Sequence, residues 1–168
     1  KLRTSMLRHE EDLYGALKKD LGKSRMESYM CEIGLTLSEL TWMEKHIRRL
    51  TREKRVPTPL AQFAARSFQS PTPYGTVLIM SPWNYPVLLT LEPLIDALVA
   101  GNTVIVKPSA YAPATSAVME MIIRETYPPE YVCMITGGHQ ENQALLTQRF
   151  DKIFFTGGKT VGREVLRH

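Results

Sequence analysis

The chain has 168 residues, of which 43% are hydrophobic and 23% charged, and both values are ordinary for a globular domain. Its formal net charge is +4, and no run of about 20 uninterrupted apolar residues is present to span a bilayer. The two cysteines, Cys31 and Cys133, are too few and too far apart for a disulfide scaffold or a zinc site. The composition favours a globular chain without a membrane segment.

Residues 1–20 and 27–53 are predicted to form two helices, because apolar residues recur at helical spacing in both. Gly22 is a stop signal after the first helix. Near the end of the second, residues 44–55 hold six basic and two acidic residues, a net charge of +4. Stacking aromatic residues are not interleaved with these charges. We therefore interpret the run as a solvated helix end and expect no nucleic-acid partner.

Four prolines between residues 56 and 73 disfavour a long helix and predict an extended connection. From residue 74 onward, short apolar runs alternate with helical segments. Strands are predicted at 75–80, 103–106, 131–136 and 152–155, and helices at 87–100, 113–127, 141–149 and 159–168. The helix at 87–100 is expected to be interrupted or to restart at Pro93.

Strands that are apolar throughout and alternate with helices predict an α/β fold with a doubly wound parallel sheet, preceded by two N-terminal helices. We divide the chain into residues 1–73, the helices and connection, and residues 74–168, the sheet domain. In such a sheet, ligands bind where the strands end. The residues that follow the four strands are Ser81, Pro82, Trp83 and Asn84, then Lys107 and Ser109, then Gly137 and Gly138, and finally Thr156, Gly157 and Gly158.

These strand ends together predict a site for a phosphate-bearing nucleotide. Glycines let a ligand approach the backbone, helix N-termini bind anions, and a lysine supplies a cation or a donor to ribose. Each feature alone is typical of an ordinary turn, so the prediction depends on their joint position. A P-loop is excluded, because the glycine required five residues before Gly158 is replaced by Ile153.

Three segments together resemble the aldehyde dehydrogenase superfamily. They are Pro82-Trp83-Asn84-Tyr85-Pro86, the run from Ala100 to Ser109, and the run from Phe154 to Gly158 followed by Val161 and Gly162. They occur in the family's order, the similarity covers essentially all of the chain, and Tyr85 and the short N-terminal region look most like the class-3 branch. The resemblance implies a Rossmann-like domain that binds NAD or NADP and an aldehyde substrate, oxidised to a carboxylic acid through a cysteine thiohemiacetal. It also implies a cytoplasmic protein that forms a homodimer or a larger assembly.

The resemblance assigns roles position by position. Asn84 matches the asparagine whose amide helps to form the oxyanion hole, a role that suits a neutral, preorganised donor. Lys107 matches the lysine that binds the adenosine ribose. The other matched cofactor residues are the loop Ser81, Pro82 and Trp83, then Ser109, Thr156, the pyrophosphate turn Gly157, Gly158 and Gly162, and Val161 beside the adenine.

Two positions depart from the family pattern. Gly158 stands where the family usually has Ser or Asn, so a side-chain contact to phosphate is lost. Ala110 stands where the family often has a Glu that accepts a hydrogen bond from ribose. Without that carboxylate, we expect nothing acidic to repel a 2′-phosphate, and we expect NADP to be tolerated beside NAD.

The family's nucleophilic Cys and general-base Glu match no residue of this chain. Cys31 and Cys133 have apolar neighbours and are expected to be buried structural thiols. The histidines His9, His46, His139 and His168 show no ligand spacing, so we predict no metal site. We expect a fragment cut at both ends, inactive alone, from the N-terminal and cofactor-binding part of such an enzyme. The alternative is a nucleotide-binding or interaction module without chemistry.

Overall fold

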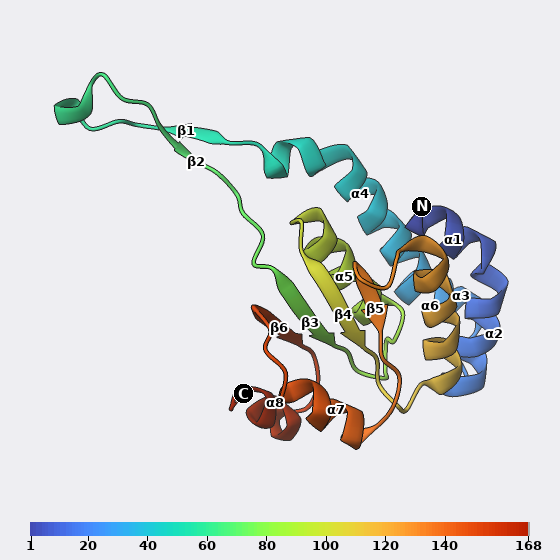
Figure 1. Cartoon of the computed structure of the whole chain (residues 1–168). Helices are drawn as coiled ribbons and strands as arrows, with labels where there is room; N and C mark the ends of the chain where they lie inside the picture. The colour runs from blue at the N-terminus through green and yellow to red at the C-terminus, as the bar shows by residue number, and fades with distance from the viewer. Residues whose placement is uncertain (168) are drawn as a thin grey trace.

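The computed structural model describes residues 1–167, and His168, where the last predicted helix ends, lies outside them. A parallel sheet of four strands forms the centre, in the order β5-β4-β3-β6 (Figure 1). The strands are β3 (Thr76–Met80), β4 (Thr103–Lys107), β5 (Val132–Met134) and β6 (Lys152–Phe155). The strand order reverses at β3, as in a doubly wound sheet. The predicted α/β fold is therefore confirmed, and β3 is the switch point where such folds bind ligands.

Helices cover both faces of this sheet. They are α5 (Leu88–Val99), α6 (Pro113–Thr126), α7 (His139–Leu146) and α8 (Lys159–Val165). Alternate residues of a strand point to opposite faces. Accordingly, Val77 and Ile79 of β3 pack in one apolar cluster with α5 and α6, whereas Leu78 and Met80 pack in a second cluster with α7.

The prediction of one helix over residues 1–20 is wrong, because two helices form there, α1 (Leu2–Arg8) and α2 (Glu10–Leu21). The backbone leaves helical geometry at His9, and three acidic residues follow in the first turn of α2. Negative charge stabilises a helix N-terminus, which favours a new start there. Gly22 ends α2 in the left-handed conformation, with φ 69°, as its sequence position predicts.

The second predicted helix begins earlier than expected and is not regular. It consists of α3 (Arg25–Ser28), a π-helical turn η1 (Tyr29–Ile33) and α4 (Gly34–Thr51). Ser24 caps its start by accepting a hydrogen bond from the Glu27 backbone N–H. The basic residues near its end, Arg48 and Arg49 among them, are exposed. Helices α2 and α4 pack against α6 and α5, respectively, and share an apolar cluster with the sheet.

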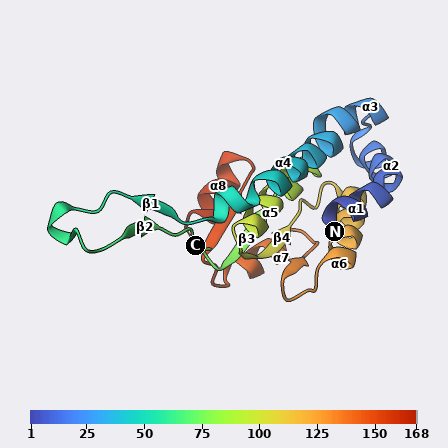
Figure 2. The same cartoon turned by 90° about the horizontal axis from the view of Figure 1, so that it is seen from above.

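The segment after α4 is an arm that projects away from the sheet and its helices (Figures 1 and 2). It contains β1 (Lys54–Val56), a 3₁₀ turn η2 (Leu60–Gln62) and β2 (Ser67–Gln69). An extended connection was predicted here, but the antiparallel pairing of β1 with β2 was not. Each strand has three residues, too few for an alternating pattern to appear in the sequence.

Two further expectations are wrong. Helix α5 continues through Pro93 without a break, since Leu91, Leu94 and Ile95 are buried on either side of it and hold the helix in place. Cys31 and Cys133 are half-buried and not buried. Among residues 1–167, none of the helices combines the length and the apolar character that crossing a bilayer requires.

Candidate nucleotide-binding site

A cleft of about 510 Å³ opens at the carboxyl ends of the strands. It lies beside β3, where the strand order reverses. Every cofactor residue predicted from the sequence lines it, apart from Gly162. These lining residues are Ser81, Pro82, Trp83, Lys107, Ser109, Thr156, Gly157, Gly158 and Val161. The fold thus brings these three segments together, although they are up to 80 residues apart in the sequence.

Lys107 ends β4 with its side chain almost wholly buried, at 3% exposure. Its Nζ donates hydrogen bonds to the carbonyl oxygens of Pro108, at 2.8 Å, and Gly137, at 2.7 Å. Burial lowers the pKa of Lys107, and the nearby charge of Glu141 acts in the opposite direction. An ammonium group has three N–H donors, so one remains for a ligand in the cleft.

The charge of Glu141 acts on Lys107, but Glu141 is not among the residues that line the cleft. Its Oε2 accepts a hydrogen bond of 2.6 Å from the Gly138 backbone N–H at the start of α7. The pKa of Glu141 is lowered by the hydrogen bonds from its own N–H and from that of Gly138, with a further contribution from Lys107. The sequence placed this residue at the start of a helix but gave no sign of its distance from Lys107. Lys107 is thus part of the cleft lining, whereas none of the lining residues within 1–167 is acidic.

The glycines of the β6–α8 turn differ in their roles. A Cβ at Gly157 would lie 2.5 Å from Cζ of Phe155, and one at Gly162 would lie 3.3 Å from its Cε1. These two glycines therefore make room for the Phe155 ring, a packing role that the sequence did not indicate. A Cβ at Gly158 would meet no atom within 4 Å. The Gly158 backbone is thus open to a ligand in the cleft.

Asn84 lies on the loop between β3 and α5 but does not line the cleft. Its side chain is exposed and makes no hydrogen bond with any residue in the described part of the chain, 1–167. Its backbone carbonyl accepts a hydrogen bond of 2.8 Å from Nζ of Lys23. Ser81, at the start of the same loop, is buried and shares a 2.6 Å hydrogen bond with Thr90 of α5. The loop is held at its backbone, while the Asn84 side chain is exposed.

Tyr111, His139 and Asn142 also line the cleft, and sequence reasoning did not predict them. It started the third crossover helix at 141, whereas α7 begins at His139. The earlier start puts His139 and Asn142, three residues apart, on one side of the helix. Asn142 Oδ1 is buried and accepts no hydrogen bond from residues 1–167. The paired glycines at 137 and 138 were the available signal for this turn.

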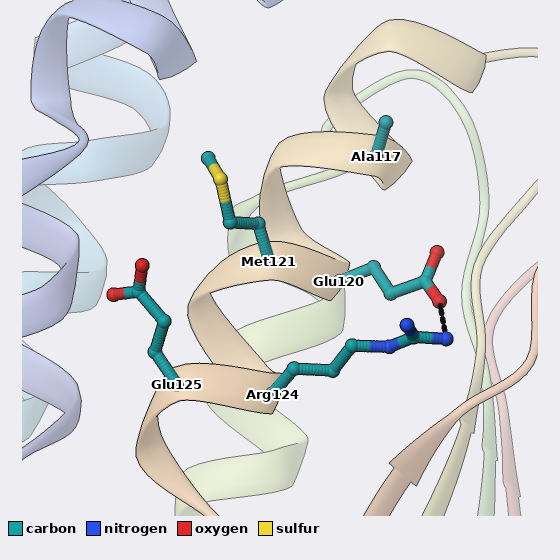
Figure 3. Close-up of a pocket in the computed structure, with 5 residues that line it drawn as sticks. All are labelled: Ala117, Glu120, Met121, Arg124 and Glu125. Atoms are coloured by element: carbon teal, nitrogen blue, oxygen red, sulfur yellow. Dashed lines mark ion pairs between the residues drawn. The ribbon is translucent and has the colours of Figure 1, made fainter.

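A second cavity, of about 460 Å³, lies along the outer side of α6 (Figure 3). Its lining residues, Ala117, Glu120, Met121, Arg124 and Glu125, all belong to that helix. Glu120 and Arg124 form an ion pair with each other at 2.6 Å, and Glu125 pairs with Arg8 and His9. No strand end or glycine turn contributes to this surface, so the nucleotide site is better assigned to the cleft.

Comparisons with known proteins agree with this arrangement. The model of the aldehyde dehydrogenase family matches residues 1–168. The 4,4'-diaponeurosporen-aldehyde dehydrogenase of Staphylococcus aureus is 44% identical over 98% of this chain and 36% of its own length. Aldehyde dehydrogenase family 3 member H1 of Arabidopsis thaliana is 37% identical over 94% of this chain and 33% of its own. The solved substrate-bound state of Staphylococcus aureus AldH, at 43% identity, matches 99% of this chain and 36% of that one with a TM-score of 0.97.

Proposed function

This chain belongs to the aldehyde dehydrogenase family, and we propose that it forms the cofactor-binding part of an NAD(P)-dependent enzyme that oxidises aldehydes to carboxylic acids. The chain spans about a third of the length of the curated relatives compared above. In this proposal the nucleophilic cysteine and the general base come from outside residues 1–168, and the whole enzyme is a homodimer or larger. The observation that carries the proposal is the convergence of Lys107, the β6–α8 turn and the β3–α5 loop on one cleft.

The donors and acceptors of the cleft suit a dinucleotide. The third N–H of Lys107 is free to donate to a ribose hydroxyl or a phosphate, and the open backbone at Gly158 admits a phosphate. The orphaned Oδ1 of Asn142 would accept a hydrogen bond from an amino or hydroxyl group. When bound, the nicotinamide cofactor supplies the oxidising power. Ala110 lines the cleft and none of the described lining residues is acidic, so in this proposal NADP is accepted beside NAD.

Asn84 is assigned to the aldehyde and not to the cofactor. Its amide has no partner within residues 1–167 and lies outside the cleft lining, on the same loop as Ser81 and Trp83. Attack on a carbonyl carbon develops negative charge on the oxygen, and a neutral donor held in place stabilises that charge more than it stabilises the substrate. Asn84 would therefore contribute to the chemical step.

Asn84→Ala in the full-length protein tests both assignments. We expect kcat for an aldehyde to fall by about 10²- to 10³-fold, the usual effect of removing one oxyanion donor. The Kd for NAD, measured by fluorescence titration, should change by less than about twofold. A tenfold weaker Kd with an unchanged kcat would make Asn84 a binding residue. A full-length protein that binds NAD but oxidises no aldehyde would support the module without chemistry.

A further inference from the structure

The β3–α5 loop is attached to the N-terminal helices by a buried ion pair. Nζ of Lys23 lies 2.5 Å from Oε1 of Glu32, and the two residues are 8% and 0% exposed. Neither residue lines the cleft, and neither was singled out by the sequence. A buried ion pair contributes little net stability, because desolvation of the two charges offsets their attraction. Stability alone is therefore a weak explanation for charges at this position.

Each member of the pair makes a second contact, and both contacts reach the loop that carries Asn84. Nζ of Lys23 donates to the Asn84 carbonyl oxygen at 2.8 Å and lies 4.1 Å from the centroid of the Tyr85 ring. Oε2 of Glu32 accepts from the Val87 N–H at 2.7 Å and, more weakly, from the Leu88 N–H at 3.4 Å. The carboxylate thus binds N–H groups at the start of α5, where negative charge is favoured.

The local backbone explains how Glu32 points inward. Glu32 lies in the π-helical turn η1, which adds a residue to the helical path and shifts the side chains that follow. Gly34 permits this turn, since a Cβ there would lie 2.8 Å from the carbonyl oxygen of Tyr29. π-Helical turns of this kind occur frequently at functional sites. The turn brings a carboxylate to the base of a loop more than 50 residues further along the chain.

We propose that Lys23 and Glu32 are positioning residues that fix the backbone of the Asn84 loop, and through it the direction of the Asn84 amide. The inference rests on the proposed function, because it requires Asn84 to act on the aldehyde oxygen. The exposed Asn84 side chain has no hydrogen bond within residues 1–167 to orient it, so its direction depends on the backbone. The ion pair fixes that backbone at two points, the Asn84 carbonyl and the Val87 N–H.

The test uses the double variant Lys23→Met/Glu32→Gln in the full-length protein. A single buried charge without a partner would destabilise the fold, so the double variant removes both charges together. We expect kcat to fall by about 10- to 100-fold in the double variant, because small misplacements of a catalytic group have effects of this size. The Kd for NAD should stay within about twofold. Arg25→Met is the matched control, since it removes the exposed pair with Glu11 and should leave kcat unchanged.

A double-mutant cycle with Asn84→Ala separates this role from a general structural one. If the pair acts through Asn84, removing it in the Asn84→Ala background should lower kcat no further. A full additional loss in that background, or a wild-type kcat in the double variant, would overturn the proposal. So would failure of the double variant to fold, judged by circular dichroism, because the pair would then serve folding itself. Asn84→Ala alone reports on the proposed function independently of the pair.

Discussion

Replacing Asp20 by alanine should destabilise the fold, because its carboxylate joins α2 to the beginning of α6. Oδ1 accepts a hydrogen bond from the Ala114 N–H at 3.2 Å. Oδ2 accepts from the Thr115 N–H at 2.7 Å and from its hydroxyl at 2.8 Å. The first N–H groups of a helix have no partner within the helix, so Asp20 serves α6 as a cap supplied by another element.

The magnitude follows from the burial of the donors. Thr115 is fully buried, at 0% exposure, so its N–H and hydroxyl would each lose their partner without access to water. Leaving a buried polar group unsatisfied costs about 1–3 kcal/mol, whereas the half-buried Ala114 N–H can turn to solvent. We expect Asp20→Ala to lower the free energy of unfolding by about 3 kcal/mol. For a chain of this size that corresponds to a decrease in Tm of roughly 6–12 °C.

Urea unfolding of the wild type and of Asp20→Ala, followed by circular dichroism, measures this difference by linear extrapolation. The matched control is Glu130→Ala, which removes an exposed carboxylate and should change the free energy of unfolding by less than about 0.5 kcal/mol. If Asp20→Ala lowers the free energy of unfolding by less than about 1 kcal/mol with an unchanged m-value, the three hydrogen bonds do not hold α6.

Three further predictions concern activity and pH. Purified residues 1–168 should form no NADH from an aldehyde, because no nucleophile or base is assigned in them, and turnover above background would contradict that assignment. Ala110→Glu in the full-length protein should keep kcat/KM for NAD and lower it for NADP by roughly 5- to 150-fold, through repulsion of the 2′-phosphate. If the wild type already rejects NADP as strongly, a residue other than Ala110 sets the preference. Hydrogen bonds with Asp12, and then with Glu125, raise the pKa of His9, so its contribution to stability is complete below about pH 6.5 and is lost as pH rises through the raised pKa. The urea midpoints of wild type and His9→Gln should therefore converge between pH 6 and pH 9, and a constant difference would refute this.

The sheet and most of the cleft could be predicted from the sequence because their signals are local. An apolar run followed by a glycine or a polar residue marks the end of a parallel strand, and parallel strands put those ends at one edge. Lys107, Gly158 and the loop at 81–83 were found in this way. What such reasoning missed depends on partners that are distant in the chain. Lys23 reaches Asn84, and Glu32 reaches Val87, through hydrogen bonds over 61 and 55 residues that no local pattern encodes.

Errors within elements have a similar origin. Proline disfavours a helix interior, so a break at Pro93 is the local expectation, but burial of α5 between α4 and the sheet outweighs that preference. In the β6–α8 turn, the sequence indicates an ordinary turn or a phosphate site at the glycines and does not indicate side-chain packing. Gly157 and Gly162 make room for the Phe155 ring, whereas the Gly158 backbone is open to a ligand. Phosphate binding therefore explains directly only the glycine at position 158.

The projecting arm connects the N-terminal helices to the sheet along the chain, but it does not hold them against the sheet. The N-terminal helices are held to the sheet domain by α2 on α6, α4 on α5 and the Lys23 contact, and none of these passes through the arm. A protease that cut the exposed chain after Arg66 would leave two pieces still bound by the same contacts. The two pieces could equally be expressed as separate polypeptides and mixed. Reconstitution of the fold from such halves would make the arm a natural place for inserted sequences or for new chain ends.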